Sequence, residues 1–206
     1  MKKLFCLITC GTIILIGHVY AQKARLGFTA GATVASYKIK AQSVSVTSKG
    51  KTGITVGLLA DIPLGSSGSF MPALNFVQKG GKLNEDGMND KLTTNYLEVP
   101  LNVAYNLKLR NGKFFIGAGP ALNMGLSGKD KWSWGTESGS DKIKFGKDKD
   151  FRRFDAALNF VTGFVGKGGM MVSFNYNTGL TNAVDPGEGD GKFKNRYFGL
   201  RVGYML

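Results

Sequence analysis

Short stretches in which apolar and polar residues alternate recur along the chain, and they constrain its fold more than any other feature. In residues 97–106, for example, Leu97, Val99 and Leu101 alternate with Glu98 and Asn102. A period of two places successive side chains on opposite faces of a β-strand, and segments of about 9 to 11 residues suit tilted strands that cross a membrane. The pattern predicts eight strands, at residues 26–37, 53–64, 70–79, 97–106, 114–124, 154–164, 172–177 and 197–206.

The segments between these strands alternate in length. Four are long, at residues 38–52, 80–94, 127–152 and 180–196, and three are short, at residues 65–68, 108–113 and 166–169. Short periplasmic turns and long surface loops are typical of an outer-membrane barrel with both termini in the periplasm. We therefore predict an all-β fold, an eight-stranded antiparallel up-and-down transmembrane β-barrel, located in the cell outer membrane.

Two observations bear on alternatives to this barrel. A soluble ligand-binding barrel of the lipocalin type would need polar outward faces, whereas one face of each predicted strand is regularly apolar and aromatic. Pro72, Pro100 and Pro120 lie within predicted strands, and a closed barrel has no free edge where a missing N–H is harmless. We expect bulges or local gaps in the hydrogen-bond ladder at these prolines.

The first residues have the features of a secretory signal peptide. Lys2 and Lys3 precede an apolar run over residues 4–19, and Ala21 lies at a predicted cleavage site. We predict that residues 1–21 are removed and that residues 22–206 form one outer-membrane β-barrel domain. Cleavage as a lipoprotein before Cys10 is the alternative, disfavoured because the apolar run continues through Ile16.

Removal of that segment would eliminate several kinds of chemistry. It takes away Cys6, Cys10 and His18, which are the cysteines and the histidine of the chain. The remainder could form no disulfide, no thiolate or imidazole metal site, and no Ser–His or Cys–His pair. We therefore expect no catalytic residues, no cofactor and no enzymatic activity.

The chain is strongly basic. Without the two lysines of the signal segment, 25 of the 27 basic residues remain against 14 acidic residues, a net charge of +11. A basic surface favours an anionic partner. Because the protein is predicted to be exported, lipid phosphates are favoured over nucleic acid.

Several short motifs lie along the predicted strands and their ends, namely Tyr96-Leu97-Glu98-Val99-Pro100-Leu101, Gly27 to Gly31, Gln78-Lys79-Gly80, Gly117-Ala118-Gly119-Pro120, Arg153-Phe154-Asp155 and Gly179-Leu180-Thr181-Asn182. Together they carry a resemblance to the PorT-like family of outer-membrane β-barrel proteins. It covers essentially all of residues 22–206, and it implies a small porin-like barrel with a link to protein secretion through the namesake of the family. Ala73 stands where relatives often have an acidic residue, and Leu206 replaces the usual terminal phenylalanine.

Six charged residues occupy the polar, inward phase of the predicted strands. An eight-stranded barrel has an interior just wide enough for side chains to fill, and unpaired charges there would cost several kcal/mol each. We expect a salt-bridged plug, with a proton or ion path as the alternative. The residues are Arg25, Asp61, Lys79, Glu98, Asp155 and Arg201.

The predicted loops contain two further groups of candidate residues. Lysines and tryptophans in residues 127–152 predict either a patch for lipid phosphates or a solvated loop whose acidic residues offset the charge. Oxygen ligands in two other loops could bind calcium, but neither loop has EF-hand spacing, so we predict no metal site. The loop 127–152 holds Lys129, Lys131, Lys142, Lys144, Lys147 and Lys149 with Trp132 and Trp134, beside Asp130, Glu137, Asp141, Asp148 and Asp150; the calcium candidates are Asn84, Glu85, Asp86, Asn89, Asp90, Asp185, Glu188 and Asp190.

The function expected from these features is that of a non-enzymatic outer-membrane barrel with a filled interior. Its four long surface loops would serve envelope integrity, surface interaction or a secretion apparatus. A narrow porin-like transport pore is the alternative. Expected partners are outer-membrane lipid, the barrel assembly machinery and periplasmic chaperones during biogenesis, and lipopolysaccharide phosphates or envelope proteins through the loops; nucleic acid is not expected.

Overall fold

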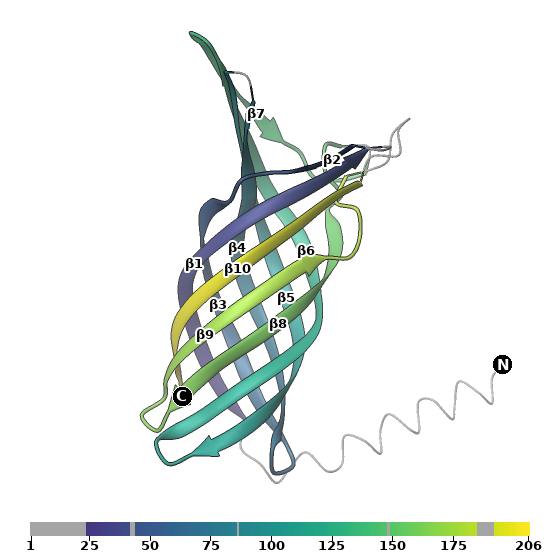
Figure 1. Ribbon diagram of the computed structural model, residues 1–206. Helices are drawn as coiled ribbons and strands as arrows, with labels where there is room; N and C mark the ends of the chain where they lie inside the picture. The colour runs from purple at the N-terminus through teal and green to yellow at the C-terminus, as the bar shows by residue number, and fades with distance from the viewer. Residues whose placement is uncertain (1–23, 42–43, 86, 148, 185–191) are drawn as a thin grey trace, which may run out of the picture.

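A single antiparallel sheet closes on itself to form a barrel (Figure 1). The computed structural model describes residues 24–41, 44–85, 87–147, 149–184 and 192–206. Eight strands form the ring, each paired with the next along the chain, and the last pairs back with the first. The ring strands are β1 (Arg25–Ala41), β3 (Lys51–Leu64), β4 (Gly68–Glu85), β5 (Met88–Leu109), β6 (Gly112–Trp134), β8 (Phe154–Gly166), β9 (Met170–Gly179) and β10 (Lys192–Met205). The predicted eight-stranded up-and-down barrel is confirmed.

The two ends of the barrel differ as the connection lengths predict. The short turns lie at the same end as the C-terminus, and longer strands and loops extend from the opposite end (Figure 1). Two of the short turns contain Gly65 and Gly169, whose φ angles of 75° and 87° favour glycine. The alternation of short and long connections therefore corresponds to the two ends of one barrel.

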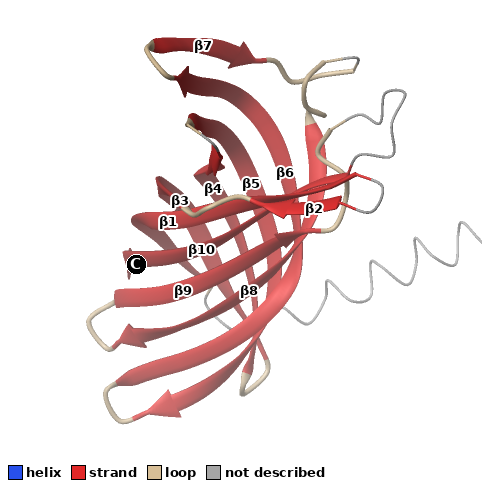
Figure 2. Cartoon of the chain, turned by 45° about the horizontal axis from the view of Figure 1, so that its top comes forward, coloured by secondary structure: helices blue, strands red, loops and turns tan. Residues whose placement is uncertain are grey.

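Much of the chain predicted as surface loop is strand. β4 and β5 remain paired as far as Glu85 and Met88, and β5 pairs with β6 up to Trp134. β2 (Val44–Thr47) pairs with β1, and β7 (Glu137–Ile143) pairs with β6, so both lie outside the ring (Figure 2). The prediction of loops at residues 80–94 and 127–152 was wrong because both faces of these strand extensions are largely polar, which removes the apolar alternation that marks the barrel strands.

The ladder is interrupted where the three prolines occur, as expected. Pairing skips two positions beside Pro72 between β3 and β4, beside Pro100 between β4 and β5, and beside Pro120 between β5 and β6. Each proline lacks the N–H that a ladder position requires. A separate β-bulge at Asn95 and Tyr96 leaves Leu126 as an extra residue in β6.

The outer and inner faces of the ring have opposite character. Outward side chains are mainly large and apolar, such as Leu58 and Val103, whose exposed fractions are 62% and 59%. Inward residues include many buried asparagines, threonines and charged side chains. This arrangement suits a barrel surrounded by lipid. Among the described residues no helix is long and apolar enough to span a membrane.

Candidate functional site

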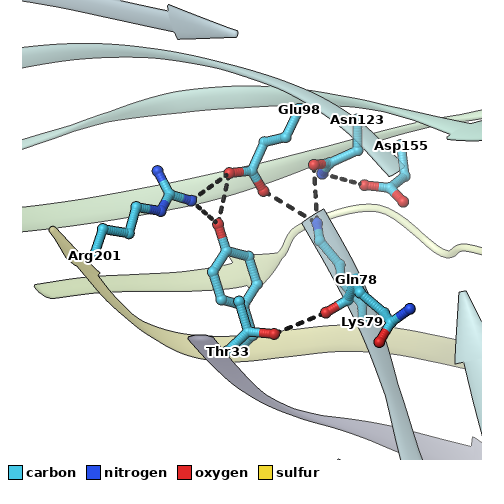
Figure 3. A network of polar contacts seen from close by, with 8 residues as sticks. Thr33, Gln78, Lys79, Glu98, Asn123, Asp155 and Arg201 are labelled. Carbon is cyan, nitrogen blue, oxygen red and sulfur yellow. Dashed lines mark hydrogen bonds and ion pairs between the residues drawn. The ribbon is translucent and has the colours of Figure 1, made fainter. Parts of the chain in front are cut away.

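A buried ionic network occupies the middle of the barrel (Figure 3). Glu98 of β5 is fully buried, and its Oε1 accepts a hydrogen bond of 2.6 Å from the Tyr197 hydroxyl. Lys79 Nζ of β4 lies 3.2 Å from Glu98 Oε2, and Arg201 Nη2 of β10 lies 3.9 Å from Glu98 Oε1. Arg201 also donates to the Tyr197 hydroxyl at 3.2 Å. Glu98 and Arg201 were predicted to face inward, and here they also form an ion pair.

The network continues to a second carboxylate. Lys79 Nζ donates to Asn123 Oδ1 at 2.9 Å, and Asn123 Nδ2 donates to Asp155 Oδ1 at 2.6 Å. The Lys79 ammonium also lies 4.9 Å from the ring centroid of Tyr96 and 5.2 Å from that of Tyr197, which adds cation–π attraction. Two cations thus balance two carboxylates, so the buried charges compensate one another.

The other two predicted interior charges lie outside this network. Asp61 forms an ion pair with Lys113, a partner that the sequence did not identify. Arg25 instead donates to the backbone carbonyls of Met205 and Leu206, at 3.1 Å and 3.3 Å. The expected set of six therefore divides into a central network, a separate pair and a contact with the C-terminal backbone.

Apolar side chains fill the barrel on the short-turn side of the network. Between this cluster and the network is a cavity of only about 30 Å³, lined in part by Asn75, Asn102 and Arg201, which is room for roughly one or two water molecules. Asn159 Nδ2 donates to Asn102 Oδ1 at 3.0 Å. The cluster consists of Leu59, Met71, Ala104, Phe115, Val161, Val165, Met171 and Met205.

An aromatic cluster closes the barrel on the loop side of the network. Phe145 and Phe151 lie in the segment that follows β7 and pack with Tyr96 and Phe193. The ring centroids of Tyr96 and Phe145 are 5.5 Å apart, and those of Phe151 and Phe193 are 5.0 Å apart. We call this group the aromatic cap; Tyr37, Leu92 and Ala183 complete it.

The outer membrane protein beta-barrel domain family matches residues 20–185. The chain belongs to this family. Its members are barrels of the outer membrane, so the match and the fold together place this barrel in the outer membrane. The PorT-like assignment is narrower than this family and stays a prediction.

The chain is also similar to several solved structures. Ail, the attachment invasion locus protein of Yersinia pestis, is 13% identical, covers 90% of this chain and 100% of its own, and has a TM-score of 0.51. OprG from Pseudomonas aeruginosa is 12% identical over 89% of this chain and 95% of its own, with a TM-score of 0.48. Neisserial surface protein A is 13% identical over 89% of this chain and 99% of its own, with a TM-score of 0.45. No curated protein sequence matches the chain.

Beyond the ring of this family barrel, the strand extensions separate charges by face. In β6, Lys129 and Lys131 point away from the barrel axis, and Asp130 points to the opposite face. Asp130 pairs directly with Asp141 of β7, and Trp132 Nε1 donates to Asp141 Oδ2 at 3.3 Å. The described acidic residues of β6 and β7 therefore do not share a face with these lysines, and the tryptophan lies with the acids.

The calcium candidates do not assemble into a site within the described part of the chain. No group of three or more acidic, histidine or cysteine side chains there could hold a metal ion. Asn84 and Asn89 pair across β4 and β5. Asp86, Asp148, Asp185, Glu188 and Asp190 lie outside the described residues, as does the predicted signal peptide.

Sequence reasoning missed the residues that complete the filled interior. Tyr197 and Asn123 lie on the inward phase of their strands. Alternation assigns a side chain to a face of the sheet but not to a position along the barrel axis, so their contacts with Glu98 and Asp155 were not predicted. Phe145 and Phe151 lie in irregular chain between strands, where no period indicates their position. Aromatic residues within a polar loop of a barrel were the one available signal.

Proposed function

We propose that this protein is a non-conducting, non-enzymatic barrel that acts through its loop-side strand extension at the cell surface. The observation that carries the proposal is the filled interior. An apolar cluster, a charge-balanced network and the aromatic cap follow one another along the barrel axis. Such a barrel acts as a support for the segments beyond the membrane.

The alternative of a narrow porin-like pore would require a path through all three layers. The buried ion pairs of Glu98 would have to separate, and leaving one buried charge without its partner costs about 3–5 kcal/mol. The cavity beside the network holds only about 30 Å³. These contacts favour a structural role for the interior over transport.

The resemblance to PorT-like proteins favours a surface role within a secretion apparatus. Envelope integrity and contact with other surface molecules are compatible with the same architecture. In each case the strand extension, and not the barrel interior, would make the specific contacts.

Conductance in planar lipid bilayers tests the proposal. The purified folded protein should give no steady single-channel steps. As a matched comparison, the variant F115A/F145A/F151A shortens side chains in the apolar cluster and the aromatic cap. This variant should show more frequent channel openings than the unaltered protein. Steady single-channel currents from the unaltered protein would overturn the proposal and favour the pore.

A further inference from the structure

Four lysines form a row across four neighbouring strand segments on the loop side of the barrel. Lys49 pairs directly with Lys82 of β4, Lys82 with Lys91 of β5, and Lys91 with Lys131 of β6. Residues directly opposite one another across a ladder point to the same face. Lys129 and Lys142 form a further direct pair beside this row. We call these six residues the lysine face; all are exposed except Lys82, which is half-buried.

Such a row is unfavourable in the absence of a partner, because like charges directly opposite one another in a sheet destabilise it. Within the described part of β4 to β7, the extension residues on this face include no carboxylate. Asp90, Asp130 and Asp141 have the opposite phase and point to the other face. The nearest acids therefore do not pair with these lysines, and an external anion would stabilise the surface.

The lysine face continues the lipid-facing surface of the barrel. In β5, Lys91 has the same outward phase as Leu97 and Val99. In β6, Lys129 follows the exposed Leu126 by three positions, which is ~10 Å along a strand and ~7 Å along the membrane normal for a strand tilted by ~45°. The headgroup region extends ~5–8 Å beyond the hydrocarbon core. Lys129 is therefore level with the lipid headgroups. Lys131 and its partner Lys91 lie two residues further along the strands, away from the membrane.

The surface is hollowed as well as charged. Lys82, Lys91, Lys129 and Lys131 line a groove of about 640 Å³. Five neutral polar residues also line it, together with Gly139 and, from the opposite phase of the strands, Asp90 and Trp132; the five are Asn84, Asn89, Ser133, Ser138 and Ser140. Four ammonium groups against one carboxylate give the groove a net positive charge among hydrogen-bonding groups, which suits a phosphorylated sugar better than an apolar ligand.

A second group of outward lysines lies on the other side of the barrel. Lys38 pairs directly with Lys194, and Lys40 pairs with Lys192, between β1 and β10. These four lysines line a hollow of about 370 Å³. They would give residual affinity for an anionic lipid when the lysine face is altered.

We propose that the lysine face binds the phosphate groups of the phosphorylated glycolipid in the outer leaflet of the outer membrane. The position favours this lipid over a soluble polyanion, because the face overlooks the surrounding membrane and continues its lipid-contacting surface. The inference extends the proposed surface function, but it does not depend on whether the barrel conducts ions.

Binding of lipid A to the folded protein in neutral detergent micelles tests the inference. The probe is fluorescent lipid A with both phosphates, and its anisotropy reports affinity. K91Q/K129Q/K131Q should bind it roughly ten- to a hundredfold more weakly than the unaltered protein, since each lysine near an anionic surface contributes about a fivefold factor. K91R/K129R/K131R keeps the charge and should retain binding.

A matched control removes the same charge from the opposite end of the barrel. K108Q/R110Q/K167Q alters exposed residues near the short turns and should leave lipid A binding unchanged. Lipid A without phosphates should bind weakly to every variant, and millimolar inorganic phosphate should not displace the intact lipid. Equal loss in the two glutamine variants, or full displacement by inorganic phosphate, would overturn the proposal.

All variants should keep the heat-dependent gel mobility of a folded barrel, since the altered side chains are on the surface. Affinity for lipid A is measured without reference to conductance. A conducting barrel that binds lipid A through these lysines would therefore refute the proposed non-conducting function and leave this inference intact.

Discussion

Glu98 connects both central cations to the hydroxyl of Tyr197 and has no exposure to solvent. The ordinary alternation of β5 predicted its inward position correctly. Its partners could not be predicted, because they lie on β4 and β10 and their heights depend on the register between strands. The sequence therefore predicted which charges enter the barrel but not which of them pair.

Replacing Glu98 tests how much this network contributes to the stability of the barrel. In E98Q, Lys79 and Arg201 lose their shared counter-charge, so we expect the free energy of unfolding to fall by about 3–5 kcal/mol. Urea unfolding of the protein in lipid bilayers measures the change.

The control for this variant is T55V. Thr55 is also fully buried, but its hydroxyl has no hydrogen-bond partner. Replacing it with a methyl group should change stability by less than about 1 kcal/mol. Equal stability of E98Q and T55V would contradict the proposed importance of the ion pairs.

At the scale of elements, the strand extensions were the largest difference from the sequence-based prediction. Barrel strands separate lipid from a packed interior, so their two faces differ in polarity. In the extension of β6, both faces carry charged residues. Positive Lys129 and Lys131 lie on one face and negative Asp130 lies on the other, so the two faces differ in the sign of their charge and not in polarity. The hydrophobic period therefore indicates the barrel portion of each strand and not its full length.

The acidic face of this extension should respond to pH. Burial, the neighbouring Asp90 carboxylate and Asp141 together raise the pKa of Asp130 from 3.8 to about 7, with burial the largest cause. Between about pH 4 and pH 7 the paired hairpin therefore keeps a proton that the opened hairpin has lost. Its stability is greatest at the lower pH and falls as the pH rises through this range.

Hydrogen exchange of the β6 and β7 amides, corrected for the intrinsic exchange rate, should show greater protection near about pH 5 than near about pH 8. D130N should remove most of this difference. In D150N it should persist, because Asp150 accepts a hydrogen bond from the Lys144 N–H in a different part of the loop. Protection that does not change with pH in the unaltered chain would contradict the assignment.

At the scale of the whole molecule, closure depends on the pairing of β10 with both β9 and β1. Deletion of residues 197–206 would leave edges of two strands without partners in hydrocarbon, at several kcal/mol for each unsatisfied group. We expect this chain to lose the heat-dependent gel mobility of a folded barrel in outer-membrane fractions.

The comparison is a change of similar size outside the ring. β7 pairs with β6 alone, so replacing residues 137–143 with a glycine–serine segment of equal length should preserve the folded band. Folded bands of equal strength from both chains would show that β10 does not close the barrel.

The extra residue in β6 has a consequence for how this surface can evolve. Up to Met124, even-numbered residues of β6 face outward; beyond Leu126, odd-numbered residues do so. Loss of the single codon for Leu126 would remove the bulge and leave one unbroken alternation along the strand. Ser127 would then follow the inward Gly125 directly, so Lys129 and Lys131 would still overlook the membrane and Asp130 would still face the other side. The cationic rim therefore tolerates loss of this codon, while the barrel below keeps its sequence.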